Sequence, residues 1–313
     1  MNTSIYSKAA SFIKSIRLLA LLSTLCAIYA MIFVPGITQA AVPEESIQSR
    51  TAVVIVSEGS ELEEARTPLL SFEQAVQEAY PKIPVLRAFT NSAARNVVRG
   101  TVEDTPSLPG ALSILEDTGY TQVVLLPTHT LPDQGTINIT QVARSFETQP
   151  GGLRKIAHVL PLLGSEEDAY DVAAILMDTF PLEPKSGEAV VFVGKEIEDG
   201  GSLAYPALSW ALFRQGKRGS LYLVATAQNE ESLKDCVNIL KMNKMKTVKL
   251  VPLVTVPDEY TQDLIYGKSA ESFASRLSKE SFEIQIHREG LASNEAIVAL
   301  WRAKLQKMLD SMN

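Results

Sequence analysis

Short runs of consecutive apolar residues alternate along the chain with longer segments in which apolar residues recur every three or four positions. The first run, residues 52–56 (AVVIV), predicts a buried strand, and residues 61–80 carry Leu62, Leu69, Phe72 and Val76 at helical spacing. The same alternation predicts further strands at 85–89, 122–126 and 158–163, and helices at 107–118, near 139–146 and at 166–180.

The pattern begins again at residues 189–193 (AVVFV), which repeat the composition of the first run. The segments that follow predict helices at 203–213, 229–242 and 295–312, and strands at 220–225, 248–256 and 282–286. Strands that are separated by helices are typical of βαβ units, in which the helices cover both faces of a parallel sheet. The sequence therefore predicts an α/β protein.

An internal repeat divides the chain into two similar halves. Residues 125–134 (LLPTHTLPDQ) and 250–259 (LVPLVTVPDE) share both prolines, a threonine and an aspartate, and their apolar positions match. Leu163-Gly-Ser-Glu-Glu and Leu291-Ala-Ser-Asn-Glu each open a predicted helix. Ordered repeats of this kind predict two βαβ halves, at 41–183 and 184–313, with the boundary around Pro181–Gly187, in LEPKSGE.

Two parallel-sheet halves that meet edge to edge predict a ligand cleft, because ligands in such folds lie beyond the carboxyl ends of the strands. The residues that follow the predicted strands are 57–60, 129–134, 194–199 and 257–260. Trp210 and Trp301, in contrast, lie on predicted helices with apolar neighbours, and we expect both in the core.

The N-terminus has the pattern of a secretory signal. Lys8, Lys14 and Arg17 precede an apolar run at 18–34, and Thr38-Gln39-Ala40 places small residues before Ala41. Residues 1–40 are therefore predicted to be a signal peptide that directs the protein to the periplasm. The apolar run also reaches the shortest length of a membrane span, so an uncleaved anchor is the alternative.

The formal net charge is −7, and loss of the basic leader would make the remaining chain more acidic. This acidity argues against nucleic acid as a partner, and against membrane binding except through the signal segment. Cys236 would be the one cysteine left, which excludes an internal disulfide. The sequence has no Gly-rich phosphate loop, so we expect no bound nucleotide.

The order of several segments resembles that of the anaerobic cobalt chelatases, the sirohydrochlorin cobaltochelatases of the class II chelatase fold. The segments that carry the resemblance are AVVIVSEGS, LRAFTN, GYTQVVLLPTHT, VLPLLGSEEDAY, VVFVGK and LVPLVTVPDE, and the likeness covers about residues 50–310. It implies two αβ halves with pseudo-twofold symmetry. It also implies insertion of Co²⁺ into a reduced tetrapyrrole such as sirohydrochlorin, in anaerobic cobalamin biosynthesis.

The resemblance also implies positions for the metal ligands. In the family a metal-binding histidine follows the first strand of the second half, and another follows the third strand of that half. Lys195 and Tyr260 occupy these two positions here. The family's acidic residue after the third strand of the first half has a displaced substitute in Asp133.

Other residues at the strand ends could supply the missing ligands, because an imidazole with several carboxylates can bind Co²⁺, Fe²⁺ or Ni²⁺. Lysine is protonated at neutral pH, so Lys195 suits a carboxylate of the macrocycle better than a metal. We predict metal ligands at His129, Asp133 and Glu259, catalytic roles for Glu58, Lys195 and Glu196, and tetrapyrrole contacts at Ser57, Lys195 and Tyr260. Alternatively, His129 is hydrogen-bonded to backbone at a strand end, and Glu58 and Glu196 face solvent or cap helices.

Three functions follow from these features. The first is an exported metal chelatase, and the second is a catalytically degenerate relative that binds a tetrapyrrole or a metal in the same cleft. The third, a two-lobed solute-binding protein, is disfavoured by the segment order. A homo-oligomer is compatible with all three.

Overall fold

The computed structural model describes residues 49–148, 152–179, 184–196, 203–216 and 219–312. The predicted signal peptide, part of the predicted boundary between the halves, and residues 197–199 of the predicted strand ends lie outside these ranges. None of the helices in the described ranges is long and apolar enough to cross a membrane.

The first half forms a four-stranded parallel sheet with the order β2-β1-β3-β4. Its strands are β1 (Thr51–Ser57), β2 (Val85–Phe89), β3 (Gln122–Pro127) and β4 (Lys155–His158). Its helices are α2 (Glu63–Ala79), α3 (Ser92–Val98), α4 (Leu108–Asp117), α5 (Gln134–Thr148) and α6 (Glu166–Thr179). The central strand β1 is buried on both faces, which explains its unbroken apolar run.

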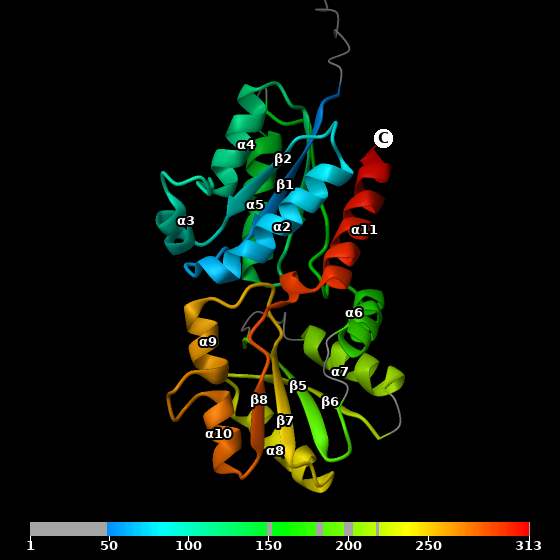
Figure 1. Cartoon of the computed structure of the whole chain (residues 1–313). Helices are drawn as coiled ribbons and strands as arrows, with labels where there is room; N and C mark the ends of the chain where they lie inside the picture. Colours follow the sequence, from blue (N-terminus) through cyan, green and yellow to red (C-terminus); the bar gives the residue numbers. More distant parts are fainter. Residues whose placement is uncertain (1–48, 149–151, 180–183, 197–202, 217–218, 313) are drawn as a thin grey trace, which may run out of the picture. The chain divides into compact units, whose positions relative to one another are not determined.

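The second half repeats this arrangement in a parallel sheet with the order β6-β5-β7-β8 (Figure 1). Its strands are β5 (Glu188–Gly194), β6 (Leu221–Thr226), β7 (Thr247–Pro252) and β8 (Glu283–Ile286). Its helices are α7 (Ala204–Gln215), α8 (Glu230–Met242), α9 (Glu259–Tyr266), α10 (Phe273–Lys279), a 3₁₀ turn at Leu291–Ser293, and α11 (Glu295–Met312). The predicted α/β fold of two similar halves is confirmed.

Two predicted strands had wrong bounds, because the apolar run after His158 belongs to a turn and because β7 ends at a proline. The strand predicted at 158–163 is β4, which ends at His158, and residues 159–163 turn towards α6 around Pro161. There the backbone N–H groups of Leu162 and Leu163 donate to the carbonyls of His129 and Thr130. The strand predicted at 248–256 ends at Pro252. The short helices α3, α9 and α10 were not predicted.

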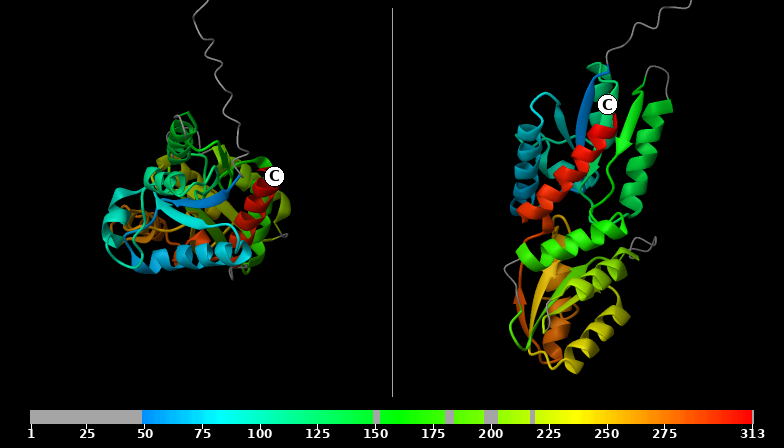
Figure 2. Two further views of the ribbon diagram at one scale, coloured as in Figure 1. Left: turned by 90° about the horizontal axis from the view of Figure 1, so that it is seen from above. Right: turned by 90° about the vertical axis from the view of Figure 1, so that its right-hand side faces the viewer.

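The last helix crosses back to the first half. Helix α11, drawn in red, packs against β3, β4 and α6 (Figures 1 and 2). Its Trp301 is fully buried, with its ring centroid 5.6 Å from that of Phe72 on α2. The prediction for Trp301 is confirmed, whereas the prediction for Trp210 is wrong, because its side chain on α7 is 53% exposed and stacks on Phe213.

The repeat is visible in contacts between equivalent residues. Thr130 and Thr255, which correspond in the repeated segments, place their hydroxyl oxygens 3.2 Å apart. The carbonyls of Val254 and Thr255 accept hydrogen bonds from the backbone N–H groups of Leu291 and Ala292. Their counterparts in the first half, the carbonyls of His129 and Thr130, accept in the same way from the turn before α6. One pair of equivalent residues therefore lies in contact where the two halves meet.

Candidate functional site

A cleft lies where the carboxyl ends of the two sheets meet. Its lining comes from the segments after β1, β3, β5 and β7, and from α7: Ser57, Glu58, Gly59, Thr128, His129, Thr130, Leu131, Asp133, Lys195, Tyr205 and residues 253–256. The ends of AVVIV and AVVFV thus face one shared cleft, as expected. Its volume of about 60 Å³ fits an ion with a few waters, so a planar macrocycle would have to lie at the mouth.

Glu58 lies on a turn whose backbone is held by its neighbours. The carbonyls of Ser57 and Glu58 accept from the N–H groups of Thr90 and Asn91 at 2.8 and 3.2 Å. Gly59 has a φ of +76°, and a Cβ there would lie 2.9 Å from the Phe89 ring. The turn therefore requires glycine, and it leaves the Glu58 side chain half exposed at the edge of the cleft.

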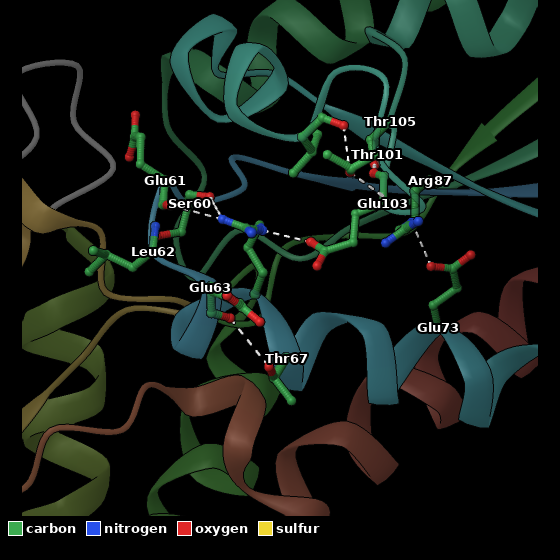
Figure 3. Close-up of polar contacts among 12 residues, drawn as sticks. Ser60, Glu61, Leu62, Glu63, Thr67, Glu73, Arg87, Thr101, Glu103 and Thr105 are labelled. Atoms are coloured by element: carbon green, nitrogen blue, oxygen red, sulfur yellow. Dashed lines mark hydrogen bonds and ion pairs between the residues drawn. The ribbon is translucent and has the colours of Figure 1, made fainter.

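The buried side chain of Arg66 holds the continuation of this turn at Ser60 and Glu61, which Figure 3 labels. Its Nη1 donates to the carbonyls of Ser60 and Glu61 at 3.1 and 2.9 Å, and its Nε donates to Glu103 at 2.7 Å. Arg66 is the first-turn residue of α2 that reaches back to the end of β1. It was not singled out from the sequence, since a lone arginine in an amphipathic helix usually faces solvent.

His129 follows β3 and is 95% buried, with a relative exposure of 5%. Neither of its ring nitrogens has a hydrogen-bond partner among the residues that the structure describes. A Cβ on Gly135 would lie 2.9 Å from Nε2, so the absence of a side chain at Gly135 makes room for the ring. The alternative of an imidazole hydrogen-bonded to backbone does not hold within the described ranges.

Glu58, His129 and Asp133 each offer one ligand atom, and these atoms lie within 4.8 Å of one another. Asp133 is fixed at the start of α5, where its Oδ1 accepts from the N–H of Thr136 at 3.0 Å. One imidazole nitrogen with two carboxylate oxygens is a donor set suited to Co²⁺, Fe²⁺, Ni²⁺ or Zn²⁺. The arrangement can therefore hold a divalent transition metal.

Lys195 enters the cleft from the second half, directly after β5. Its Nζ lies 3.4 Å from Asp258 Oδ2 and 3.7 Å from Glu58 Oε2. Burial would lower the pKa of the Lys195 ammonium, but the charges of Glu58 and Asp258 outweigh burial and raise it above its usual value. Lys195 therefore stays protonated and cannot act as a metal ligand or as a base at neutral pH.

Asp258 is the carboxylate that Lys195 meets in its own half. Its Oδ1 caps α9 by accepting from the N–H of Thr261 at 2.8 Å, which leaves Oδ2 for the ammonium. Burial raises the pKa of Asp258, but the bonds from Thr261 and the charge of Lys195 bring it below its usual value. The pair is therefore ionised at neutral pH.

Tyr205 on α7 holds the backbone of this segment. Its hydroxyl donates to the carbonyl of Lys195 at 2.8 Å, and its ring covers Gly194 so closely that a Cβ there would overlap it. Burial, and to a smaller extent the charge of Asp133, raises the pKa of Tyr205. A tyrosine that stays protonated can keep donating this bond.

Three predicted site residues lie away from the cluster. Glu196 is exposed, and its carboxylate accepts from the Asn229 side chain at 2.8 Å. Tyr260 is also exposed, and its hydroxyl accepts from Gln228 at 2.9 Å. Glu259 is exposed on the first turn of α9 and lies outside the group of possible ligands within the described part of the chain.

The sequence reasoning missed Asp258 and the role of Tyr205. Asp258 corresponds to Asp133 in the repeated segments, and that equivalence was the signal that could have favoured it over Glu259. Tyr205 carries no comparable signal, because only the fold brings its helix beside the end of β5.

A model of the cobalt chelatase (CbiK) family matches residues 51–310, which is most of the chain. This chain belongs to the cobalt chelatase family. The sirohydrochlorin cobaltochelatase CbiKC of Nitratidesulfovibrio vulgaris (strain Hildenborough) is 24% identical over 265 residues, which are 85% of this chain and 93% of the relative.

Solved structures of chelatases share the fold of this cobalt chelatase family member. SirB from Bacillus subtilis with Fe³⁺ superposes with a TM-score of 0.56 at 14% identity, over 83% of this chain and 95% of SirB. The sirohydrochlorin chelatase SirB from Bacillus subtilis subspecies spizizenii, in complex with cobalt, gives 0.55 at 11% identity, over 83% of this chain and 95% of that one. The predicted family is therefore confirmed.

Proposed function

We propose that this protein binds a divalent transition metal through Glu58, His129 and Asp133 and inserts it into a reduced tetrapyrrole at the mouth of the cleft. The observation that carries the proposal is the buried imidazole of His129, which has no partner among the described residues and has two carboxylates within ligand distance. A buried polar atom without a partner costs about 1–3 kcal/mol, and a metal bond would offset that cost.

The proposed substrates follow from the family and the donor set. Relatives of this chain are named as a sirohydrochlorin cobaltochelatase and as chelatases with cobalt or Fe³⁺. We therefore propose Co²⁺ and sirohydrochlorin as the substrates, with Fe²⁺ and Ni²⁺ as other metals that the same donors would accept. The metal is the cargo of the reaction.

Insertion replaces two pyrrole N–H protons by the metal, so the site needs groups that can accept protons. Glu58, whose side chain is half exposed, is the best placed carboxylate, and Asp133 is the neighbouring one. Lys195 stays protonated and has the charge to bind a carboxylate of the macrocycle. Ser57 lines the cleft but is buried, whereas Tyr260 and Glu196 are exposed and do not line it, so their predicted contacts and roles stay proposals.

A second candidate function is a carrier that holds metal or tetrapyrrole without inserting. The observation that favours it is the contact of Lys195 with Glu58. Insertion needs the Glu58 carboxylate as a metal ligand and as a base, and the ion pair with Lys195 opposes both roles. Lys195 and Tyr260 also replace the histidine pair that the family resemblance implies.

An insertion assay separates the two functions. Purified protein is incubated anaerobically with sirohydrochlorin and Co²⁺, and the absorption spectrum is followed in parallel for the protein and for His129→Ala. Metal insertion above the uncatalysed rate that is lost in His129→Ala supports the chelatase. A spectral shift on binding without accelerated insertion supports the carrier, and equal rates in both proteins contradict the proposed metal site.

We also propose that the protein works in the periplasm after removal of residues 1–40. The support is the sequence of the leader, with basic residues before an apolar run. Mass spectrometry of the protein recovered from periplasmic and membrane fractions tests this. A soluble chain that begins at Ala41 is expected, and an intact N-terminus in the membrane fraction would indicate the uncleaved anchor.

A further inference from the structure

The possible metal ligands of the first half have counterparts in the second half. Asp133 corresponds to Asp258 in the repeat, and each accepts from a threonine N–H three residues later, Thr136 and Thr261, at 3.0 and 2.8 Å. His129 corresponds to Val254, which lines the same cleft.

Glu58 also has a counterpart, because it follows the first strand of its half as Lys195 follows the first strand of the other. The second copy therefore consists of Lys195, Val254 and Asp258. It has no imidazole, and it has an ammonium group where the first copy has a carboxylate.

The ammonium of Lys195 takes up the place of a cation in this second copy. Its Nζ lies 3.4 Å from Asp258, the counterpart of a possible ligand, and 3.7 Å from Glu58, a possible ligand of the first copy. The Lys195 side chain is only 27% exposed, and its backbone is held by Tyr205. The charge is therefore confined to the cleft.

We propose that Lys195 is a tethered cation that fills the second copy of the metal site and competes with a bound metal for Glu58. This inference rests on the proposed metal site of the first half. The nearby ammonium would repel a divalent ion bound at Glu58, His129 and Asp133. Its ion pair with Glu58 would also weaken the attraction between that carboxylate and the metal. The consequence is weaker holding of the metal, which favours its release to an acceptor.

The test measures Co²⁺ binding to the full mature chain by anaerobic calorimetry. Lys195→Met removes the charge and keeps the length of the side chain, and Lys195→Gln serves if the methionine variant does not fold. Lys195→Arg keeps the charge. Lys234→Met, on the exposed face of α8, makes the same change in net charge away from the cleft.

Wild-type protein is expected to bind one Co²⁺, and Lys195→Met or Lys195→Gln is expected to bind it about tenfold more tightly. Lys195→Arg and Lys234→Met should bind as the wild type does. An affinity in Lys195→Met and Lys195→Gln that equals or falls below that of the wild type overturns the inference. If the wild type then binds Co²⁺ and His129→Ala does not, the proposed metal site stands although the inference on Lys195 fails. Binding by neither the wild type nor the Lys195 variants overturns both.

A double variant tests whether the second position is a copy of the metal site. Lys195→Glu with Val254→His recreates the Glu58, His129 and Asp133 set around Asp258. Two Co²⁺ ions per chain are expected, against one for the wild type and for Val254→His alone. A single ion in the double variant contradicts the equivalence of the two positions.

Discussion

The imidazole of His129 lies in a buried position where an apolar side chain would give a higher free energy of unfolding. Its two ring nitrogens have no partner among the described residues, although the ring is 95% buried. Such a residue is destabilising in the absence of a ligand, since each unsatisfied buried polar atom costs about 1–3 kcal/mol. An unpaired buried residue that faces carboxylates is typical of a binding site and not of a packed core.

His129→Leu should therefore separate stability from binding. The substitution removes the unpaired nitrogens while it fills a similar volume, so the metal-free protein is expected to gain about 1 kcal/mol in free energy of unfolding. Co²⁺ binding should fall by more than about 100-fold, because loss of a ligand exceeds the loss of a supporting contact. Urea unfolding and calorimetry measure the two effects, and a destabilised variant that still binds Co²⁺ would contradict the assignment.

The sequence indicated His129, Asp133 and Glu58, because all three follow apolar runs that had to be parallel strands. It did not distinguish Asp258 from Glu259. These neighbours differ by one position at the start of α9, where one side chain caps the helix beside the cleft and the next faces solvent. The start of a short helix is set by tertiary contacts, so the choice between them could not be made from pattern alone.

At the scale of elements, two buried or half-buried ion pairs support neighbouring strands of the first sheet (Figure 3). Arg66 and Glu103 brace the turn that carries Glu58, and their closest atoms are 2.7 Å apart. Arg87 and Glu73 join β2 to α2 at the same distance. The first pair is coupled to the cleft through the backbone of Ser60 and Glu61. Within the described part of the chain, the second pair makes no hydrogen bond or ion pair with that turn.

Arg66→Met should lower both stability and metal affinity. It leaves one buried carbonyl, one partly buried carbonyl and the Glu103 carboxylate without their donor, which should cost about 3 kcal/mol in free energy of unfolding. Arg87→Met is the matched control, since it should lower stability and leave Co²⁺ affinity unchanged. Urea unfolding and calorimetry on both variants test this. Equal Co²⁺ affinities in the two variants would show that metal binding does not depend on the contacts of Arg66 with the turn.

Stability should also depend on pH through β4, where His158 ends the strand. Burial lowers the pKa of His158, and the charge of Glu147 raises it by a smaller amount. Because the unfolded chain binds the proton more readily, His158 supports folding above about pH 6.5 and this support is lost as the pH falls. His158→Gln should reduce the loss of stability between pH 7 and pH 5 in urea unfolding. An unchanged pH dependence would contradict this role.

The long and strongly patterned elements were predictable, and the short ones were not. The strands AVVIV and AVVFV are buried on both faces, and that burial forces a continuous apolar run. Helices α3, α9 and α10 have seven or eight residues, too few for a helical period to stand out. The strand β7 ends at Pro252, and the apolar run after β4 belongs to a turn, so apolar composition alone did not give the bounds of either strand.

At the scale of the whole described unit, the C-terminal helix joins the halves. One cluster of buried residues includes Val53 and Phe72 from the first half, Phe192 and Leu208 from the second, and Trp301 of α11. Apolar composition alone did not distinguish Trp301 from Trp210. The return of α11 to the first sheet is a tertiary arrangement, which helical periodicity does not encode.

The two tryptophans allow a direct comparison. Trp301→Ala leaves a cavity in the shared cluster and should cost about 3–5 kcal/mol in free energy of unfolding. Trp210→Ala removes an exposed ring and should change stability by less than about 0.5 kcal/mol. Thermal and urea unfolding of both variants measure the difference. Equal losses would contradict the placement of α11 against the first half.

The most direct test of the metal site is an anomalous difference map, measured at the cobalt edge, from crystals of the mature protein grown with Co²⁺ under anaerobic conditions. One strong peak within ligand distance of Glu58, His129 and Asp133 is the predicted result. A peak at other residues, or no peak at Co²⁺ concentrations that saturate binding in solution, would contradict the assignment.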